Sequence, residues 1–371
     1  MNNHEYEIGL RKDQLDTPAL LLDLDALEHN IQTMAAFCKK AGIALRPHAK
    51  IYKGTPIFAW MQLRAGAIGI TVSKLAEAET LAAGGISDIL IANQVVGARK
   101  VQRLVNLAAY TDVKVAVDSH ENVQELSDAA VARGVKLGVL LEINIGNNRC
   151  GVEPFAPSLN LAHKVLALPG LKLCGIMGYD GHLAFVEDLK ERAERSRQAY
   201  HLLIEARDYL EKAGIKIEIV SGGGSATYQS AASVKGLTEL QAGSYLLLDT
   251  TYYENGLKDF RPVLTILATV ISRPQRQGAE NIAILDVGRK MLDTFYGLPT
   301  VKYPEGEIFS MPQEHSRLRL ADPQTKLAVG DKVELWVNDA NGTVNLYDSL
   351  YAMRGDIVEA VWELTGRGKA T

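Results

Sequence analysis

The stretch IGITVSKLAEAETLAAGGISDILIA, residues 68–92, carries the pattern that decides the fold. Residues 68–72 and 89–92 are short apolar runs, typical of strands that are buried in a parallel sheet. Residues 75–83, which lie between them, have apolar side chains at the spacing of a helix. A strand, a helix and a second strand in this order predict a parallel pair joined by a helical crossover.

The same alternation extends from about residue 25 to about residue 250. Helices are predicted over 25–41, ended by Gly42, from Pro56 onward, and over 187–213. Further strands are predicted at 43–45, 113–117, 137–144, 173–179, 215–221 and 237–242. Eight strands alternating with helices predict an α/β protein with a (β/α)₈ TIM barrel. The count of eight favours this barrel over an open doubly wound sheet.

After residue 253 the sequence no longer alternates between apolar runs and helical spacing. Short strand-like runs follow at 263–271, 281–286, 332–337, 343–345 and 357–363, and turn-rich segments such as 273–275 separate them. We therefore predict a barrel over 16–253 and a C-terminal all-β domain over 254–371. Residues 18–23 are a predicted strand that could pair with either domain, and residues 1–15 could join the β-domain.

Composition excludes several classes of partner. The formal net charge of -4 argues against nucleic acid and against anionic membranes, because both favour basic surfaces. No apolar run is long enough to span a membrane, and residues 1–14 lack the apolar core of a signal peptide, so we expect a cytoplasmic protein. The three cysteines are widely spaced and form no CxxC, which favours small buried residues over a zinc site or disulfides.

The active site of such a barrel lies where the strands end. Reactive or glycine-rich residues follow five predicted strands, at 46–50, 144–151, 179, 221–225 and 241–245. Lys50 is either a solvated surface charge or a desolvated amine that can form a Schiff base. The SGGGS run at 221–225 is either a flexible turn or a backbone cradle for a phosphate. No dinucleotide-binding GxGxxG is present, so NAD is a weak alternative.

Several motifs together resemble one known family. They are TPAL at 17–20 with DLD at 23–25, RPHAK at 46–50, NRCG at 148–151 and ELQAGSY at 239–245. The resemblance is to the D-threonine aldolase / D-serine dehydratase-like family, and it extends over nearly the whole chain. These proteins are pyridoxal 5′-phosphate (PLP) enzymes with the alanine-racemase type of barrel, so the resemblance implies this fold, PLP as cofactor and a homodimer.

The resemblance also implies a role for each matching residue. Lys50 would carry PLP as a Schiff base, Tyr179 would pack on the pyridine ring, and Arg149 would approach the phenolic oxygen. Gln241 falls where alanine racemases place an arginine beside the pyridine nitrogen. The cofactor-binding set also includes the residues of the strand ends and glycine-rich loops, namely His48, Ser221, Gly222, Gly223, Gly224, Ser225, Gly243, Ser244 and Tyr245.

The match breaks on the substrate side. The resemblance implies a divalent metal held by a His-x-Cys or His-x-Asp pair, but the chain has Asp339 and Asn341 there. These oxygen donors suit Mg²⁺ or Mn²⁺ rather than zinc, and a metal-free hairpin turn at 339–342 is the alternative. Three further departures from the family pattern are Ile51, Phe185 and Phe295.

The resemblance thus implies a PLP-dependent lyase that cleaves a D-β-hydroxy amino acid to glycine and an aldehyde. Candidate bases are His315, His182 and Tyr52, and His315 has the Glu-His context of the family. A metal-independent racemase, dehydratase or transaldolase of the same fold remains an alternative, as does a PLP-binding protein without turnover. A small amino acid is the expected substrate in each catalytic case.

Overall fold

The computed structural model describes residues 4–371, which divide into two compact units. The first unit holds the residues up to Asn30, Ile51–Lys53 and Leu246–Gly368. The second holds Ile31–Lys50, Gly54–Tyr245 and Lys369–Thr371.

The second unit is built on an eight-stranded parallel sheet, in the order β2-β9-β8-β7-β6-β5-β4-β3. The end strands β2 and β3 are joined by the hydrogen bond from the Ile68 N–H to the Leu45 carbonyl and by a parallel bridge between His48 and Thr71. The predicted (β/α)₈ barrel is therefore confirmed. Its strands are β2 (Ala44–Leu45), β3 (Ile70–Val72), β4 (Asp88–Ile91), β5 (Asp112–Val117), β6 (Leu137–Glu142), β7 (Leu171–Gly178), β8 (Ile219–Gly222) and β9 (Glu239–Leu240).

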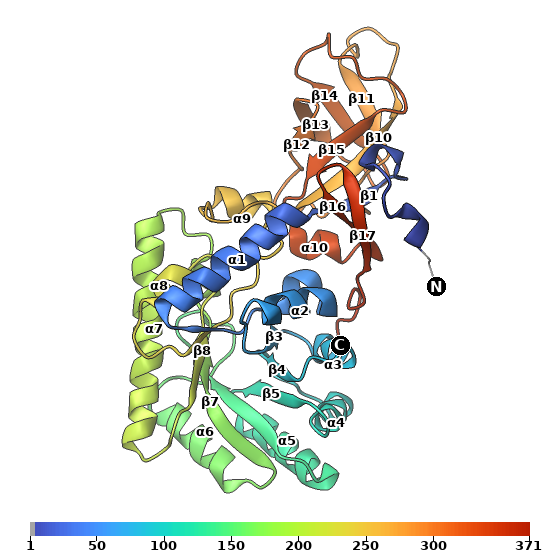
Figure 1. Cartoon of the computed structure of the whole chain (residues 1–371). Helices are drawn as coiled ribbons and strands as arrows, with labels where there is room; N and C mark the ends of the chain where they lie inside the picture. Colours follow the sequence, from blue (N-terminus) through green and yellow to red (C-terminus); the bar gives the residue numbers. More distant parts are fainter. Residues whose placement is uncertain (1–3) are drawn as a thin grey trace. The chain divides into compact units, whose positions relative to one another are not determined.

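Helices connect these strands and lie on the outside of the sheet (Figure 1). The helix that the opening stretch predicts is α3, at the predicted bounds Leu75–Ala83. The long helix predicted over 187–213 is α7 (Leu189–Lys212), which begins where the Asp188 side chain accepts the N–H groups of Lys190 and Glu191. The others are α1 (Leu24–Ala41), α2 (Pro56–Arg64), α4 (Ala98–Leu107), α5 (His120–Arg133), α6 (Ala156–Ala167) and α8 (Tyr228–Ala232).

The first unit contains a mainly antiparallel sheet in the order β13-β14-β11-β10-β1-β16-β17, with β15 paired to β10 and β12. Strand β1 (Ala19–Asp23), which the sequence assigned to neither domain, pairs with β10 and β16 in this sheet. The N–H of Gly9 also donates to the Val358 carbonyl of β17. The other strands are β10 (Leu264–Ser272), β11 (Ile282–Leu285), β12 (Val301–Tyr303), β13 (Gly306–Ser310), β14 (Ser316–Leu320), β15 (Lys332–Trp336), β16 (Ser349–Arg354) and β17 (Ile357–Glu363).

One sequence prediction in this unit is wrong. Residues 339–342 are not a hairpin turn, and 343–345 are not a strand, because α10 (Ala340–Val344) occupies this segment. Asp339 is its N-cap and accepts the Gly342 N–H at 3.1 Å, a favoured arrangement at a helix start. The glycine and the β-branched Thr343 and Val344 are poor helix formers, which hid the helix in the sequence. A second short helix is α9 (Thr250–Glu254).

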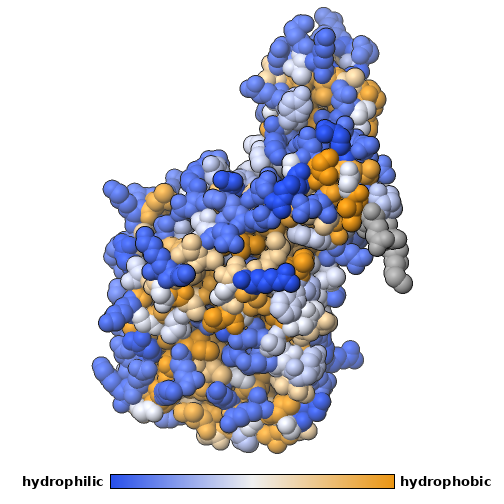
Figure 2. Space-filling model, viewed as in Figure 1, coloured by the Kyte–Doolittle hydropathy of each residue, from blue (hydrophilic) through white to orange (hydrophobic). Residues whose placement is uncertain are grey.

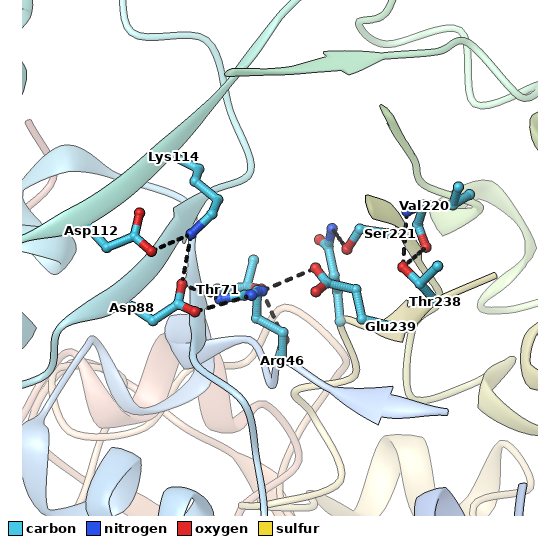
Figure 3. A network of polar contacts seen from close by, with 10 residues as sticks. Arg46, Thr71, Asp88, Asp112, Lys114, Val220, Ser221, Thr238 and Glu239 are labelled. Atoms are coloured by element: carbon cyan, nitrogen blue, oxygen red, sulfur yellow. Dashed lines mark hydrogen bonds and ion pairs between the residues drawn. The ribbon is translucent and has the colours of Figure 1, made fainter. Parts of the chain in front are cut away.

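A buried ion cluster lies at the amino ends of the barrel strands (Figure 3). The Arg46 guanidinium contacts Glu239 at 3.0 Å and Asp88 at 2.6 Å, and Lys114 contacts Asp88 at 3.0 Å. Asp88 and Glu239 are the first residues of β4 and β9. The sequence placed Arg46 at the carboxyl ends of the strands, but its side chain points to the opposite end of the barrel, where residues serve stability rather than catalysis.

The face seen in Figure 2 mixes hydrophilic and apolar residues over each unit. Among the described residues, no helix is both long enough and apolar enough to cross a bilayer.

Candidate active site

The predicted cofactor residues all lie in the barrel unit, at the carboxyl ends of strands. His48 and Lys50 follow β2, Tyr179 follows β7, and Arg149 lies in the loop after β6. The glycine-rich loops 222–225 and 241–245 follow β8 and β9. We call this group of strand ends the rim. Because parallel strands of one barrel end on the same side, residues far apart in sequence are gathered here.

His48 fixes the backbone that leads to Lys50. Its N–H donates to the Ala242 carbonyl at 3.1 Å, and its Nδ1 accepts the Lys50 N–H at 3.2 Å. Burial, together with the positive charges of Lys50 and Arg149, lowers the pKa of His48 to about 3. The imidazole is therefore neutral near pH 7, which leaves Nδ1 as the acceptor that this bond requires. The Lys50 side chain itself is exposed on the 3₁₀ turn Ala49–Tyr52.

Tyr179 and Arg149 lie together on the rim. The guanidinium carbon of Arg149 is 5.5 Å from the centre of the Tyr179 ring, within the range of a cation–π contact. A guanidinium nitrogen of Arg149 lies 3.9 Å from the carboxylate of Glu142, the last residue of β6. Burial raises the pKa of Glu142, and Gln94 donates to it at 2.6 Å.

Glu142 is a site residue that the sequence analysis missed. Glu142 is the last residue of the apolar strand LGVLLE. A single carboxylate at the carboxyl end of a buried barrel strand is the sequence pattern that could have indicated a site residue here. Its negative charge next to Arg149 orients that guanidinium toward the Tyr179 side of the rim.

The two glycine-rich loops are bonded to each other. The Ser225 hydroxyl accepts the Tyr245 N–H at 3.0 Å, and the Gln241 amide donates to the Ser221 hydroxyl at 2.7 Å. Gly243 must be glycine, because a Cβ there would lie 2.5 Å from the His48 carbonyl oxygen. The loops are thus held in a fixed position beside the start of the Lys50 turn.

Gly224 lies beside the ring of Tyr179. A Cβ on Gly224 would lie 3.5 Å from the Tyr179 ring. The backbone at Gly224 is half-buried and carries no side chain beside the ring, and backbone of this kind lets N–H groups approach an anion closely.

The candidate bases divide between the units. His182, on the 3₁₀ turn Gly181–Leu183, lies in the barrel unit beside the loop that carries Arg149, since a Cβ on Gly146 would be 3.5 Å from its Nε2. Tyr52 is fully buried and belongs to the first unit. His315 is exposed in the loop between β13 and β14 of that unit.

Comparisons with known proteins agree with this arrangement. A family model described as alanine racemase, N-terminal domain, matches residues 22–251, and one described as a putative serine dehydratase domain matches 263–353. A D-threonine aldolase from Arthrobacter sp is 36% identical over 96% of this chain and 93% of that protein. A 3-hydroxy-D-aspartate aldolase from Paracoccus denitrificans (strain Pd 1222) is 32% identical over 97% and 94%.

The fold is also similar to that of a solved structure. The crystal structure of D-threonine aldolase from Filomicrobium marinum matches with a TM-score of 0.92 at 34% identity, over 97% of this chain and 98% of that one. The chain belongs to the D-threonine aldolase / D-serine dehydratase-like family. Like the other members, it is a PLP-dependent lyase. The sequence-based prediction of family, cofactor and enzyme class is confirmed.

The rim of this family member fits PLP by its donor chemistry. The lysine suits the aldehyde of PLP, and the arginine beside an aromatic ring suits its phenolate. The backbone at Gly224, which carries no side chain, suits the phosphate, and the neutral histidine supports the lysine turn. All of them lie within the barrel unit.

The predicted metal position does not fit a metal centre of the kind the family pattern implies. Asp339 serves as the N-cap of α10, and Asn341 supplies only a neutral amide. Burial raises the pKa of Asp339, and so does the nearby Asp293 carboxylate. No group of three or more His, Cys, Asp or Glu side chains within residues 4–371 is placed to hold a metal ion. The sequence-based suggestion of Mg²⁺ or Mn²⁺ at these two residues therefore gains no support.

Proposed function

We propose that this lyase cleaves a D-configured β-hydroxy amino acid to glycine and an aldehyde. The observation that carries the proposal is the gathering of Lys50, Tyr179, Arg149 and two glycine-rich loops on one rim. The similarity to a D-threonine aldolase and to a 3-hydroxy-D-aspartate aldolase supports the substrate class.

The residues of the rim divide the work of holding the cofactor. Bound PLP supplies an electron sink that stabilises negative charge on Cα of the substrate. In our proposal Lys50 would hold PLP covalently, Arg149 would face its phenolic oxygen, and Tyr179 would pack on the ring. The loops 222–225 and 241–245 would bind the phosphate, and Gln241 would offer a neutral amide to the ring nitrogen.

The remaining task is to remove the proton of the β-hydroxyl group, and we propose His182 for it. It lies beside the loop that carries Arg149, and burial lowers its pKa from 6.5, helped by Arg195 and opposed by Asp180. A base must be neutral to accept a proton, and a histidine is neutral above its pKa. Because its pKa is lowered, the His182 imidazole becomes protonated, and so unable to act as a base, only at a lower pH than an unperturbed histidine.

This assignment predicts the pH dependence of the reaction. We expect the acidic limb of kcat/KM to lie at lower pH than the titration of an unperturbed histidine, and His182→Asn to lower kcat/KM about a hundredfold. A pH–rate profile of the variant should lack the acidic limb. His315→Asn is the comparison, since the family context favours His315. If only His315→Asn has these effects, the base is His315 and not His182.

The reaction should not depend on an added metal. The purified enzyme, treated with EDTA and dialysed, should keep its activity within about twofold, because Asp339 and Asn341 lack the donors of a strong divalent site. Glycine and aldehyde released from a panel of D-β-hydroxy amino acids are the readout. A loss of activity with EDTA that Mn²⁺ or Mg²⁺ restores would contradict this prediction.

The same assay separates the alternatives. Loss of ammonia with formation of a keto acid would identify a dehydratase, and inversion at Cα alone would identify a racemase. Transfer to a second aldehyde would identify a transaldolase, and bound PLP without any turnover would identify a PLP-binding protein. Each outcome replaces the proposed cleavage to glycine and an aldehyde with another defined function.

We further propose a cytoplasmic homodimer with a barrel domain and a C-terminal β-domain, and the β-domain includes β1 through its pairing with β10 and β16. The family resemblance supports the homodimer. Sedimentation of the purified protein tests the oligomeric state.

A further inference from the structure

The glycine-rich loop after β8 is held by a side chain from a distant helix. The N–H of Gly223 donates to the Tyr200 hydroxyl at 2.6 Å. Gly223 has φ +84°, a left-handed conformation that favours glycine. Tyr200 comes from α7 and is fully buried, so it reaches the loop from the packed layer between this helix and the barrel strands.

The hydroxyl of Tyr200 is itself fixed by a buried carboxylate. It donates to Asp180 at 2.9 Å, and the Ser196 hydroxyl donates to the other carboxylate oxygen at 2.9 Å. Asp180 is 1% exposed. A backbone N–H can only donate, so the direction of the chain is set: Tyr200 accepts from Gly223 and donates its own proton to Asp180. Burial and the nearby Asp180 raise the pKa of Tyr200 well above its usual value, which keeps the phenol protonated.

The start of the loop also packs closely against the ring of Tyr200. A Cβ on Gly222 would lie 2.6 Å from both the Gly178 carbonyl oxygen and the Tyr200 ring. The loop is thus packed on Tyr200 by shape as well as bonded to it. Asp180 directly follows Tyr179, so one short segment sets both the ring of Tyr179 and the position of the loop.

We infer that Asp180 and Tyr200 are positioning residues for the phosphate of PLP. The Gly223 N–H is bonded to Tyr200 and is therefore not available to the phosphate. This bond would fix the loop so that the residues after Gly223 face the phosphate. Gly224, next to the Tyr179 ring, is the first of these. The inference rests on the proposed role of loop 222–225 as the phosphate cradle, and it assigns two residues that no motif of the sequence singled out.

The test is Tyr200→Phe, which keeps the ring and removes the acceptor of the Gly223 N–H. A buried N–H without a partner destabilises the loop conformation, so we expect the Kd for PLP to rise about tenfold. The Kd for pyridoxal, which lacks the phosphate, should change less than about twofold. Both constants are measured by absorbance and fluorescence on reconstitution of the cofactor-free enzyme.

A matched control is Tyr209→Phe, a partly exposed tyrosine on the same helix, which should bind both compounds like the wild type. Equal weakening of PLP and pyridoxal by Tyr200→Phe would overturn the inference in favour of a general structural role, and so would an unchanged Kd for PLP. If Tyr200→Phe does not fold, Asp180→Asn is measured by the same comparison and must discriminate in the same way. A wild-type protein that binds no PLP would instead overturn the proposed site itself.

Discussion

Lys50→Ala should abolish the visible absorbance band of the bound cofactor and reduce lyase activity by at least about a thousandfold. The reason is that only an amine can hold the aldehyde of PLP covalently, and the alanine variant has no amine at this point of the rim. His48 keeps the backbone of this turn in place through its Nδ1, so the loss should come from the missing amine rather than from a collapsed loop. Absorbance spectra and product assays of both proteins measure the effect.

Two further variants sharpen this test. Lys50→Arg retains the positive charge without a nucleophilic amine and should lose the band as completely as alanine does. Lys136→Ala removes an exposed lysine that precedes β6, at the opposite end of the barrel, and should keep the wild-type spectrum and activity. A band that persists in Lys50→Ala and disappears with another lysine would reassign the cofactor.

Arg46→Met should lower the free energy of unfolding by about 3–5 kcal/mol, the largest stability effect that we expect of a single change. The substitution leaves Glu239 charged and unpaired, although its side chain is only 3% exposed. Asp88 loses the same partner but keeps Lys114 at 3.0 Å and is 32% exposed, so it contributes less. Urea denaturation of the purified proteins measures the difference.

The origin of this loss can be separated from the bulk of the side chain. The double variant Arg46→Met with Glu239→Met removes the stranded charge and should recover most of the lost stability, since buried pairs can often be replaced by apolar residues. The control Arg197→Met breaks an exposed pair with Glu194 and should cost less than about 1 kcal/mol. A double variant as unstable as the single one would show that the packing of Arg46 matters more than its charge.

The periodic parts of the fold were predictable from local sequence. The alternation of apolar runs and helical spacing predicts eight barrel strands and the bounds of α3, because each element buries its own apolar face. The failure at 339–345 has an equally local cause. An aspartate N-cap followed by poor helix formers resembles a turn, and burial of Ala340, Thr343 and Val344 within the unit decides for a helix instead.

The candidate site was predictable only in part. Lys50, Tyr179, Arg149 and the glycine loops follow strands, so the rule that barrel strands end on one side brings them together without any structure. Arg46 and His48 differ by two residues and yet serve opposite ends of the barrel, which the sequence does not reveal. Their partners, Glu239 for Arg46 and Ala242 for His48, come from the last strand and its loop.

The sequence by itself determined that Lys50 stands at a barrel strand end in a PLP-enzyme family, since both follow from motifs and periodicity along the chain. Only the tertiary structure decided how that rim is supported. The buried Glu142 carboxylate lies beside the exposed Arg149, and the buried Asp180 and Tyr200 lie beneath Gly223. Such groups must find partners wherever the packed chain offers them, and which partner is within reach depends on distances that no local pattern encodes.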